Sequence, residues 1–383
     1  MATNPATDTQ PKAASTGIVG PEREIPFWRT AIGDEELNEV ISTFGKKKFS
    51  CGPVTQELEN EIAAMLNVPY AVCTTSGTMA LVMGLMAHGI GPGDEVIVPT
   101  RTFIATAHAA SLLGAKVVLV DCLPETPLID VAEVERKITP ATRAIMPVHL
   151  NGRTADLDAL KSLADKNGIV IVEDAAQGFL SKMPNGAFQG TASGAGCFSF
   201  GMVKLVSTGQ GGVVVTPHKD VYEKLRALRD HGVRDVIAHE YLVPGANFKF
   251  TDVLASIGLW QVRKGPEKAA HVNAIYKRYV EGLADLPFIS MLAVDVDGGE
   301  VSLWPEAVCA EREALMDYLD EHGIQTRKFL PCLHTAPHYD TGERYANSER
   351  FGREGLNLPG GPDLPMESVD RTIEILRAYV QKR

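Results

Sequence analysis

The sequence lacks the features that would place the protein in a membrane, outside the cell or around a metal ion. No apolar run approaches the ~18 residues of a transmembrane helix, and the N-terminus has no apolar signal-peptide region. The six cysteines show no CxxC or other metal-ligand spacing; they are Cys51, Cys73, Cys122, Cys197, Cys309 and Cys332. We therefore expect a cytoplasmic protein with reduced cysteines, no membrane partner and no metal site.

An excess of positive charge is also missing. The chain carries 37 Lys and Arg against 48 Asp and Glu, so its formal net charge is −11. This balance argues against a nucleic-acid partner. A phosphorylated ligand would have to be held by helix dipoles and a few basic side chains.

Alternating apolar patterns are abundant, and they predict an α/β fold. With 383 residues, of which 45% are hydrophobic, the chain has material for one large and one small domain. From Tyr70 onward strand and helix patterns alternate, which indicates a mostly parallel sheet with helices on both faces. The predicted strands cover residues 95–99, 116–120, 144–148, 169–172 and 212–215, and the predicted helices include 34–44, 55–66 and one long helix over 252–283.

These patterns divide the chain into four parts. Residues 1–20 are rich in Ala, Thr, Pro and Ser, which predicts a flexible tail. Residues 21–252 hold the N-terminal helices and the large domain, 253–286 a long linking helix, and 287–383 a smaller C-terminal domain.

Lys204 stands in apolar sequence, in the stretch CFSFGMVKLVSTGQGGVVV over residues 197–215. Burial there would lower the pKa of its amine, so that the neutral form could attack a carbonyl and form a Schiff base. The alternative is a lysine that reaches the surface from the end of a strand. The glycines after Lys204 allow a tight turn, and Ser199 offers a hydroxyl to a phosphate.

Asp174 follows an apolar strand pattern directly, in GIVIVEDAAQ over residues 168–177. Ligands of α/β proteins gather at the carboxyl ends of the strands, where an Asp can keep a proton on the pyridine nitrogen of pyridoxal phosphate. Taken alone, this residue is more typical of a helix N-cap.

A third stretch, CTTSGTMAL over residues 73–81, indicates the passage from a strand into a helix. Its hydroxyl groups and its glycine would leave backbone N–H groups exposed at the positive end of a helix, where a phosphate can bind. Ser and Thr are also common helix caps, so this stretch is ambiguous by itself.

Taken together and in this order, the three stretches resemble the DegT/StrS family of sugar aminotransferases, which use pyridoxal phosphate and have the aspartate-aminotransferase fold (fold type I). The resemblance extends from about Ile25 to the C-terminus and implies a large domain with a seven-stranded type of sheet. The cofactor residues that it implies are Lys204 for the covalent bond, Ser199, Gly77 and Thr78 for the phosphate, Asp174 for the pyridine nitrogen and Gln177 for the 3-hydroxyl group.

Two further cofactor contacts follow from the same resemblance. Phe103, after the strand pattern at 95–99, corresponds to an aromatic residue that covers the pyridine ring; the alternative is a core Phe. Asn247, in GANFKFTD over residues 245–252, corresponds to an Asn that reaches the phosphate of the neighbouring subunit. This implies a homodimer with shared active sites, whereas an ordinary turn Asn would imply nothing of the kind.

The segment GIQTRKFLPCLH over residues 323–334 resembles the substrate-side segment of the family. It implies substrate contacts for Arg327 and His334, against the alternative of surface and packing roles. Three positions depart from the family pattern: Lys328 stands where proline is common, Gln210 replaces a Glu, and Gly201 replaces a larger residue.

The resemblance implies transfer of an amino group from glutamate, or glutamine, to a keto sugar linked to a nucleotide, at C3 or C4. Lys204 would act as the general acid and base, and Asp174 would keep the ring nitrogen protonated. The alternatives are transfer to a keto-cyclitol or a free sugar phosphate, a sugar dehydratase, for which the lysine would be a histidine, and a non-catalytic protein that kept the fold.

Overall fold

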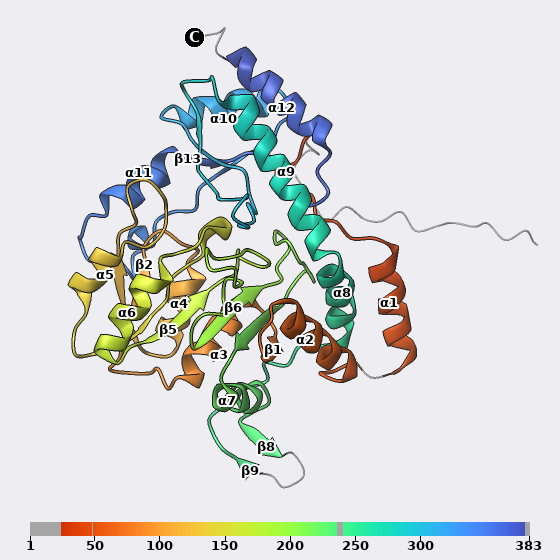
Figure 1. The fold of residues 1–383 in the computed structure, drawn as a ribbon, viewed down its shortest axis with the longest axis vertical. Coiled ribbons are helices and arrows are strands. Elements are labelled where there is room, and N and C mark those ends of the chain that lie inside the picture. Colours follow the sequence, from red (N-terminus) through yellow and green to blue (C-terminus); the bar gives the residue numbers. More distant parts are fainter. Residues whose placement is uncertain (1–23, 48, 236–239, 380–383) are drawn as a thin grey trace, which may run out of the picture.

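The computed structural model describes residues 24–47, 49–235 and 240–379 (Figure 1). The predicted tail over residues 1–20 lies outside the described residues. A large α/β part is built on a seven-stranded sheet, and a smaller C-terminal part on a four-stranded sheet. This confirms the predicted fold class. None of the helices in the described part of the chain has the length and apolar character that a membrane span requires.

The seven-stranded sheet has the order β1-β7-β6-β5-β4-β2-β3. Six strands are parallel, and β7 runs antiparallel to both of its neighbours. The strands are β1 (Tyr70–Thr74), β2 (Glu95–Pro99), β3 (Lys116–Val120), β4 (Thr142–Ile145), β5 (Val170–Asp174), β6 (Ala195–Ser199) and β7 (Gly212–Thr216). The carboxyl ends of the parallel strands therefore share one edge.

The strand predictions were correct in place but not complete. The bounds of β2 and β3 agree with the predicted ones, whereas β4 ends at Ile145 rather than at residue 148. Pro147, which lacks an N–H group, follows that end, and its carbonyl accepts a hydrogen bond from the Asp174 amide (2.9 Å). The sequence analysis missed β6, because its Ala-Gly-Cys-Phe-Ser sequence has no β-branched residue.

Side chains of the strands alternate between two layers of helices. Val72, Val96 and Val172 pack against α3, α4 and α7, while Ile97 and Ile171 pack against α6 on the other face. Of the N-terminal helices, α2 lies beside β1, and α8 (Asp252–Arg263) lies between α2 and α1 (Figure 1). The helices are α1 (Asp34–Gly45), α2 (Pro53–Met65), α3 (Gly77–Ala87), α4 (Ala105–Leu112), α5 (Val131–Lys137), α6 (Leu157–Asn167) and α7 (Lys219–Arg229).

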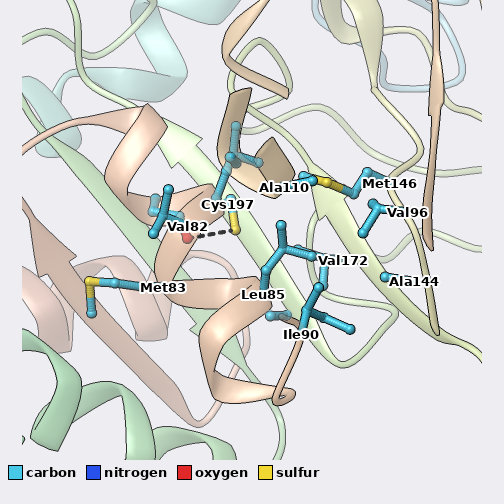
Figure 2. Packing of buried hydrophobic residues seen from close by; sticks show 14 of the residues in the cluster. Val82, Met83, Leu85, Ile90, Val96, Ala110, Ala144, Met146, Val172 and Cys197 are labelled. Carbon is cyan, nitrogen blue, oxygen red and sulfur yellow. Dashed lines mark hydrogen bonds between the residues drawn. The ribbon is translucent and has the colours of Figure 1, made fainter. Parts of the chain in front are cut away.

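Helix α3 is apolar on all sides because it is enclosed by the sheet, α4 and α7. Figure 2 shows its side chains Val82, Met83 and Leu85 beside residues of the strands. The Cys197 thiol of β6 donates a hydrogen bond to the Ala80 carbonyl (3.3 Å), so this cysteine has a packing role. Tight packing fixes the N-terminus of α3 against the ends of β6 and β7.

The predicted long helix over 252–283 is wrong in one respect: it is two helices, α8 (Asp252–Arg263) and α9 (Gly265–Leu283). The break at Lys264 has a simple cause, because Pro266 has no N–H group to donate to residue 262 and stands at the first turn of α9. Helix α8 packs on α1 and α2, and α9 packs on α12 of the C-terminal part.

The C-terminal part pairs its strands in the order β10-β11-β13-β12, all antiparallel. It lies above the edge of the large sheet at which the parallel strands end (Figure 1). The Leu333 amide donates to the Thr100 carbonyl, just beyond β2 (2.9 Å). The remaining elements are β8 (Val233–Asp235), β9 (Glu240–Tyr241), β10 (Ser290–Met291), β11 (Glu306–Val308), α10 (Arg312–Glu321), β12 (Arg327–Lys328), α11 (Ala346–Glu354), β13 (Gly355–Asn357) and α12 (Met366–Tyr379).

Candidate active site

A cavity of about 350 Å³ opens at the carboxyl ends of the parallel strands. Its walls come from both sheets and from the N-terminal segment. It is lined by residues that include Phe27, Ser76, Gly77, Thr78, Phe103, Asp174, Gln177, Ser199, Lys204, Trp304, Arg327 and Asn357. Eight of these residues were predicted: the structure brings together Gly77, Thr78, Phe103, Asp174, Gln177, Ser199, Lys204 and Arg327.

Lys204 lies on the loop between β6 and β7, and this loop turns the lysine into the cavity. Phe200 closes the loop through backbone hydrogen bonds to Thr208 (3.0 Å) and Gly211 (2.8 Å). Leu205 and Val206, the residues after the lysine, are buried in the core. The loop is therefore anchored on both sides of Lys204.

The Lys204 amine has no hydrogen bond or ion pair with any of the described residues, and it lies 5.3 Å from the centre of the Trp304 ring. Burial lowers the pKa of this amine from 10.5 to about 8, and the charge of Asp174 opposes part of the shift. About one molecule in ten then carries a neutral amine at pH 7. A partnerless amine of this kind is available for attack on a carbonyl.

Asp174 is the last residue of β5 and is buried, with 4% of its surface exposed. One carboxylate oxygen accepts a hydrogen bond from the Thr106 hydroxyl (2.7 Å), and the other accepts one from the Ala176 amide (3.1 Å). Burial raises the pKa of this carboxyl, and the hydrogen bonds and the charge of Lys204 oppose the rise. A cationic ligand beside Asp174 would therefore stabilise the ionised form of its carboxyl.

Gln177 is oriented by a neighbouring loop. Its side-chain oxygen accepts a hydrogen bond from the Asn151 amide (2.7 Å), in a loop that follows β4. No acceptor for its side-chain nitrogen is found among the described residues. That N–H₂ group is free to donate to an oxygen of a ligand in the cavity.

The N-terminus of α3 and the end of β6 form a cradle for an anion. The Ser76 hydroxyl caps the helix at the Met79 amide (3.2 Å), which leaves the amides of Gly77 and Thr78 without a partner among the described residues. A Cβ at position 77 would stand 2.6 Å from the Ser199 Cβ and 2.9 Å from its hydroxyl, so only glycine allows the close approach. Backbone donors, helix dipole and hydroxyl converge here, as phosphate binding requires.

Phe103 lies between β2 and α4 with 51% of its surface exposed, although it lines the cavity. An aromatic ring that is exposed toward a cavity can stack on a flat ligand. The alternative of a core Phe is therefore wrong.

Asn247 does not line the cavity. Its side chain is exposed, its oxygen accepts a weak hydrogen bond from the Lys249 amide (3.4 Å), and its backbone pairs with Asp230. Within one chain it therefore has no access to the cradle.

Arg327 and His334 lie in different places, although one segment carries both. Arg327 is exposed at the cavity and stacks on Phe27, with 4.7 Å from its guanidinium carbon to the ring centre. His334 lies outside the cavity: its Nδ1 shares a hydrogen bond with the Thr100 hydroxyl (2.8 Å), and its ring packs on Tyr345. The prediction of a substrate contact for His334 is not supported by this geometry.

Three residues of the site were missed by the sequence analysis. Trp304 and Asn357 line the cavity from the C-terminal part, and Thr106 orients Asp174 from α4. Thr106 lies three residues after Phe103, so the helical spacing offered a signal for it. Nothing local marks Trp304 or Asn357, because their place depends on how the two sheets face each other.

These residues fit pyridoxal phosphate. The cradle at Gly77 and Ser199 suits its phosphate, the Lys204 amine its aldehyde, and Asp174 its ring nitrogen. An exposed aromatic ring and a free amide donor complete the set on the same cavity. No group of His, Cys, Asp and Glu side chains in the described residues is arranged to hold a metal ion.

Comparison with known proteins agrees with this reading. Residues 30–377 match the DegT/DnrJ/EryC1/StrS aminotransferase family. The chain is 35% identical over 370 residues to the dTDP-3-amino-3,4,6-trideoxy-alpha-D-glucose transaminase of Streptomyces venezuelae, a match that covers 94% of this chain and 97% of that protein.

Solved structures give the same result. S. venezuelae DesV, in complex with a ketimine intermediate, superposes with a TM-score of 0.88 and 33% identity, over 94% of this chain and 99% of that chain. The aminotransferase TlmJ from Streptoalloteichus hindustanus superposes with a TM-score of 0.89 and 28% identity, over 94% and 99%. The match to the family profile, the extent of the identity and the site itself lead to one conclusion: this chain belongs to the DegT/DnrJ/EryC1/StrS family and is a pyridoxal-phosphate-dependent sugar aminotransferase.

Proposed function

We propose that this enzyme moves an amino group from glutamate or glutamine to a keto sugar linked to a nucleotide. The observation that carries the proposal is the partnerless, half-buried Lys204 amine on the same cavity as the buried Asp174 carboxyl. The relative from S. venezuelae, a transaminase of a dTDP-linked amino sugar, supports this class of acceptor.

The cofactor would be held at five points. Lys204 would bind it covalently, Gly77, Thr78 and Ser199 would bind its phosphate, and Asp174 would pair with its ring nitrogen. Gln177 would donate to its 3-hydroxyl oxygen, and Phe103 would cover one ring face. When bound, pyridoxal phosphate supplies an electron sink that delocalises the charge left when a proton leaves the donor carbon.

Two side chains would handle the protons. The Lys204 amine, with its pKa of about 8, would accept the proton from the Cα atom of the amino donor and return it in the reverse direction. The Asp174 carboxylate would stay ionised beside a protonated ring nitrogen, because the ion pair offsets the burial that raises its pKa. Thr106 would hold this carboxylate in place.

An arginine without an ion-pair partner at the mouth of the cavity supports an anionic acceptor. Arg327 lines the mouth without an ion-pair partner among the described residues, and Lys328 lies next to it, paired with Glu313 (2.5 Å). In a chain of net charge −11, this placement suits the phosphates of a nucleotide rather than a neutral ring.

The enzyme would act as a homodimer in which Asn247 reaches the partner's cradle. An exposed apolar stripe on α1 supports an interface: Leu37, Ile41 and Phe44 are each more than half exposed, and they are spaced for one face of the helix. We also propose the cytoplasmic location that the sequence predicts; the full burial of the Cys73 and Cys197 thiols is consistent with a protein that needs no disulfide.

An activity assay tests the acceptor. The purified enzyme, loaded with cofactor, is supplied with glutamate or glutamine and with a panel of nucleotide-linked keto sugars, free keto sugar phosphates and keto-cyclitols. We expect turnover with a nucleotide-linked sugar. Turnover with a keto-cyclitol alone would overturn this acceptor class.

Mixing two inactive variants tests the shared site. A Lys204→Ala chain and an Asn247→Ala chain are unfolded, refolded together and assayed. If Asn247 serves the partner, the mixed dimer contains one intact site and activity returns. If Asn247 serves its own chain, the mixture stays as inactive as its components, and if it serves no site, the Asn247→Ala chain is already active by itself.

A further inference from the structure

A small recess adjoins the main cavity on the side of the C-terminal part. It has a volume of about 30 Å³, and its walls include Arg101, Leu150, Glu306 and Phe329. It shares Gln177, Trp304 and Asn357 with the main cavity. The recess is therefore a side chamber of the active site, large enough for a group of a few atoms.

Arg101 is a buried cation without an acidic partner in this recess. It follows β2 and is 5% exposed. One terminal nitrogen donates to the Leu330 carbonyl, and the guanidinium lies over the Phe329 ring (4.8 Å). Its buried Nε has no hydrogen-bond acceptor, and the described residues place no carboxylate in an ion pair with it. The Cys332 side chain lies within reach of the guanidinium, and Nε is left without an acceptor.

The acidic side chain in the recess, Glu306, already has an ion-pair partner. Glu306 lines the recess, but its carboxylate is paired with the Arg153 guanidinium (2.5 Å), and both side chains are buried. These two charges cancel, so Arg101 leaves one positive charge uncompensated in the recess. A buried charge in this state is costly until an anion joins it.

Two other buried polar atoms at the recess lack partners as well. Asn357 is 9% exposed, and no hydrogen bond reaches its side-chain oxygen; the Trp304 indole N–H is also buried without an acceptor. Exchanging the oxygen and nitrogen of the Asn357 amide would turn this residue into a further donor toward the recess. Such groups are rarely left unsatisfied unless a ligand completes them.

We propose that Arg101, aided by Asn357, binds a carboxylate group of the amino donor in this recess. A guanidinium nitrogen without an acceptor suits a carboxylate oxygen, and one uncompensated charge matches a monoanionic group. A phosphate dianion would be larger and would stand beside Glu306. Trp304 joins the recess to Lys204, so a donor anchored here has its amino group on the side of the catalytic amine.

This inference rests on the proposed function, since it specifies the donor of the same site. It also explains a choice of residue: a lysine at position 101 would carry the charge but not the two parallel donors. An arginine in this place therefore predicts a donor that is a carboxylic acid, not a simple amine.

Titration calorimetry with glutarate, a dicarboxylate that cannot react, tests the proposal on the cofactor-loaded enzyme. The variants are Arg101→Met, Arg101→Lys and, as a matched control from the mouth of the same cavity, Arg327→Met. We expect Arg101→Met to weaken glutarate binding by roughly 30-fold or more and Arg101→Lys by less, while Arg327→Met stays within about threefold of wild type. In kinetics, the KM for glutamate should rise more than kcat falls.

Two controls keep the result interpretable. Without ligand, Arg101→Met should melt at or above the wild-type temperature, because it removes an uncompensated buried charge; if it does not fold, Arg101→Lys carries the test. Unchanged glutarate binding in a folded Arg101 variant would overturn the proposal, as would a parallel titration with inorganic phosphate in which the variant loses phosphate binding but keeps glutarate binding. Failure of the enzyme to transfer amino groups to any keto sugar would instead overturn the proposed function. The calorimetry measures binding of glutarate and does not depend on amino transfer.

Discussion

Two lysines of this protein, Lys204 and Lys268, are similarly desolvated but differ in their hydrogen bonds and in their access to a cavity. Burial lowers the pKa of both the Lys204 and the Lys268 amine to about 8. Lys268, on α9, donates to the Gln261 side-chain oxygen (2.5 Å) and to the Ala31 carbonyl (3.2 Å), and it is 4% exposed. Lys204 has no such partner and lines a cavity. A lowered pKa alone therefore does not identify a nucleophile; access and the absence of a partner do.

The two lysines are also connected. The Gln261 oxygen that accepts from Lys268 accepts from the Ser207 amide as well (3.2 Å), three residues beyond Lys204. Lys268 thus supports the loop between β6 and β7 through Gln261, while we propose that Lys204 carries the chemistry.

The largest expected effect is that of Lys204→Ala. Loss of the amine removes both the covalent bond to the cofactor and the proton transfer at the donor carbon, so amino transfer should fall by at least ~10³-fold. Turnover and the absorption of the bound cofactor measure this. A variant that keeps a tenth of the activity would contradict the assignment of Lys204.

The second prediction concerns pH and acylation by acetic anhydride, followed by mass spectrometry on the cofactor-free protein. Only the neutral amine reacts, so the rate at Lys204 should rise about tenfold between pH 7 and pH 9, with a midpoint near 8. Lys268 has the same midpoint but is closed to the reagent, and it should stay unmodified while the protein is folded. Equal labelling of the two lysines would contradict the conclusion that Lys204 is accessible and Lys268 is not.

The smallest effect is expected for Lys268→Met. Turnover should stay within severalfold of wild type, and the free energy of unfolding should change by at most ~2 kcal/mol, since the lost hydrogen bonds and the relieved burial of a charge oppose each other. The folded pKa lies below that of the unfolded chain, so the unfolded state binds more protons between pH 8 and 10.5. Denaturation at several pH values should favour Met increasingly as the pH falls from 10.5 toward 8. A fall in turnover as large as that of Lys204→Ala would refute a supporting role.

Much of the site could be predicted because its signals are local. Asp174 ends an apolar strand, Gly77 and Thr78 begin a helix, and Lys204 sits between aromatic residues and glycines. The rule that parallel strands end at one edge brings these stretches together without any further information. The resemblance to the family then assigned their roles.

The rest depends on contacts between distant segments. Trp304 and Asn357 enter the cavity only because the C-terminal sheet faces the large one. His334 matched the family pattern, but the pattern does not show that Thr100 already occupies its ring nitrogen. Arg101 stands two residues before Phe103, yet its burial without an acidic partner is visible only in three dimensions.

Reduction with borohydride after incubation with pyridoxal phosphate tests the central claim most directly, because it fixes the cofactor to the amine that holds it. Mass spectrometry of the digested protein then locates the pyridoxyl group among the lysines. We expect it on Lys204, in one copy per chain, with Lys268 unmodified. A label on Lys268 or another lysine, or no label at all, would contradict the account.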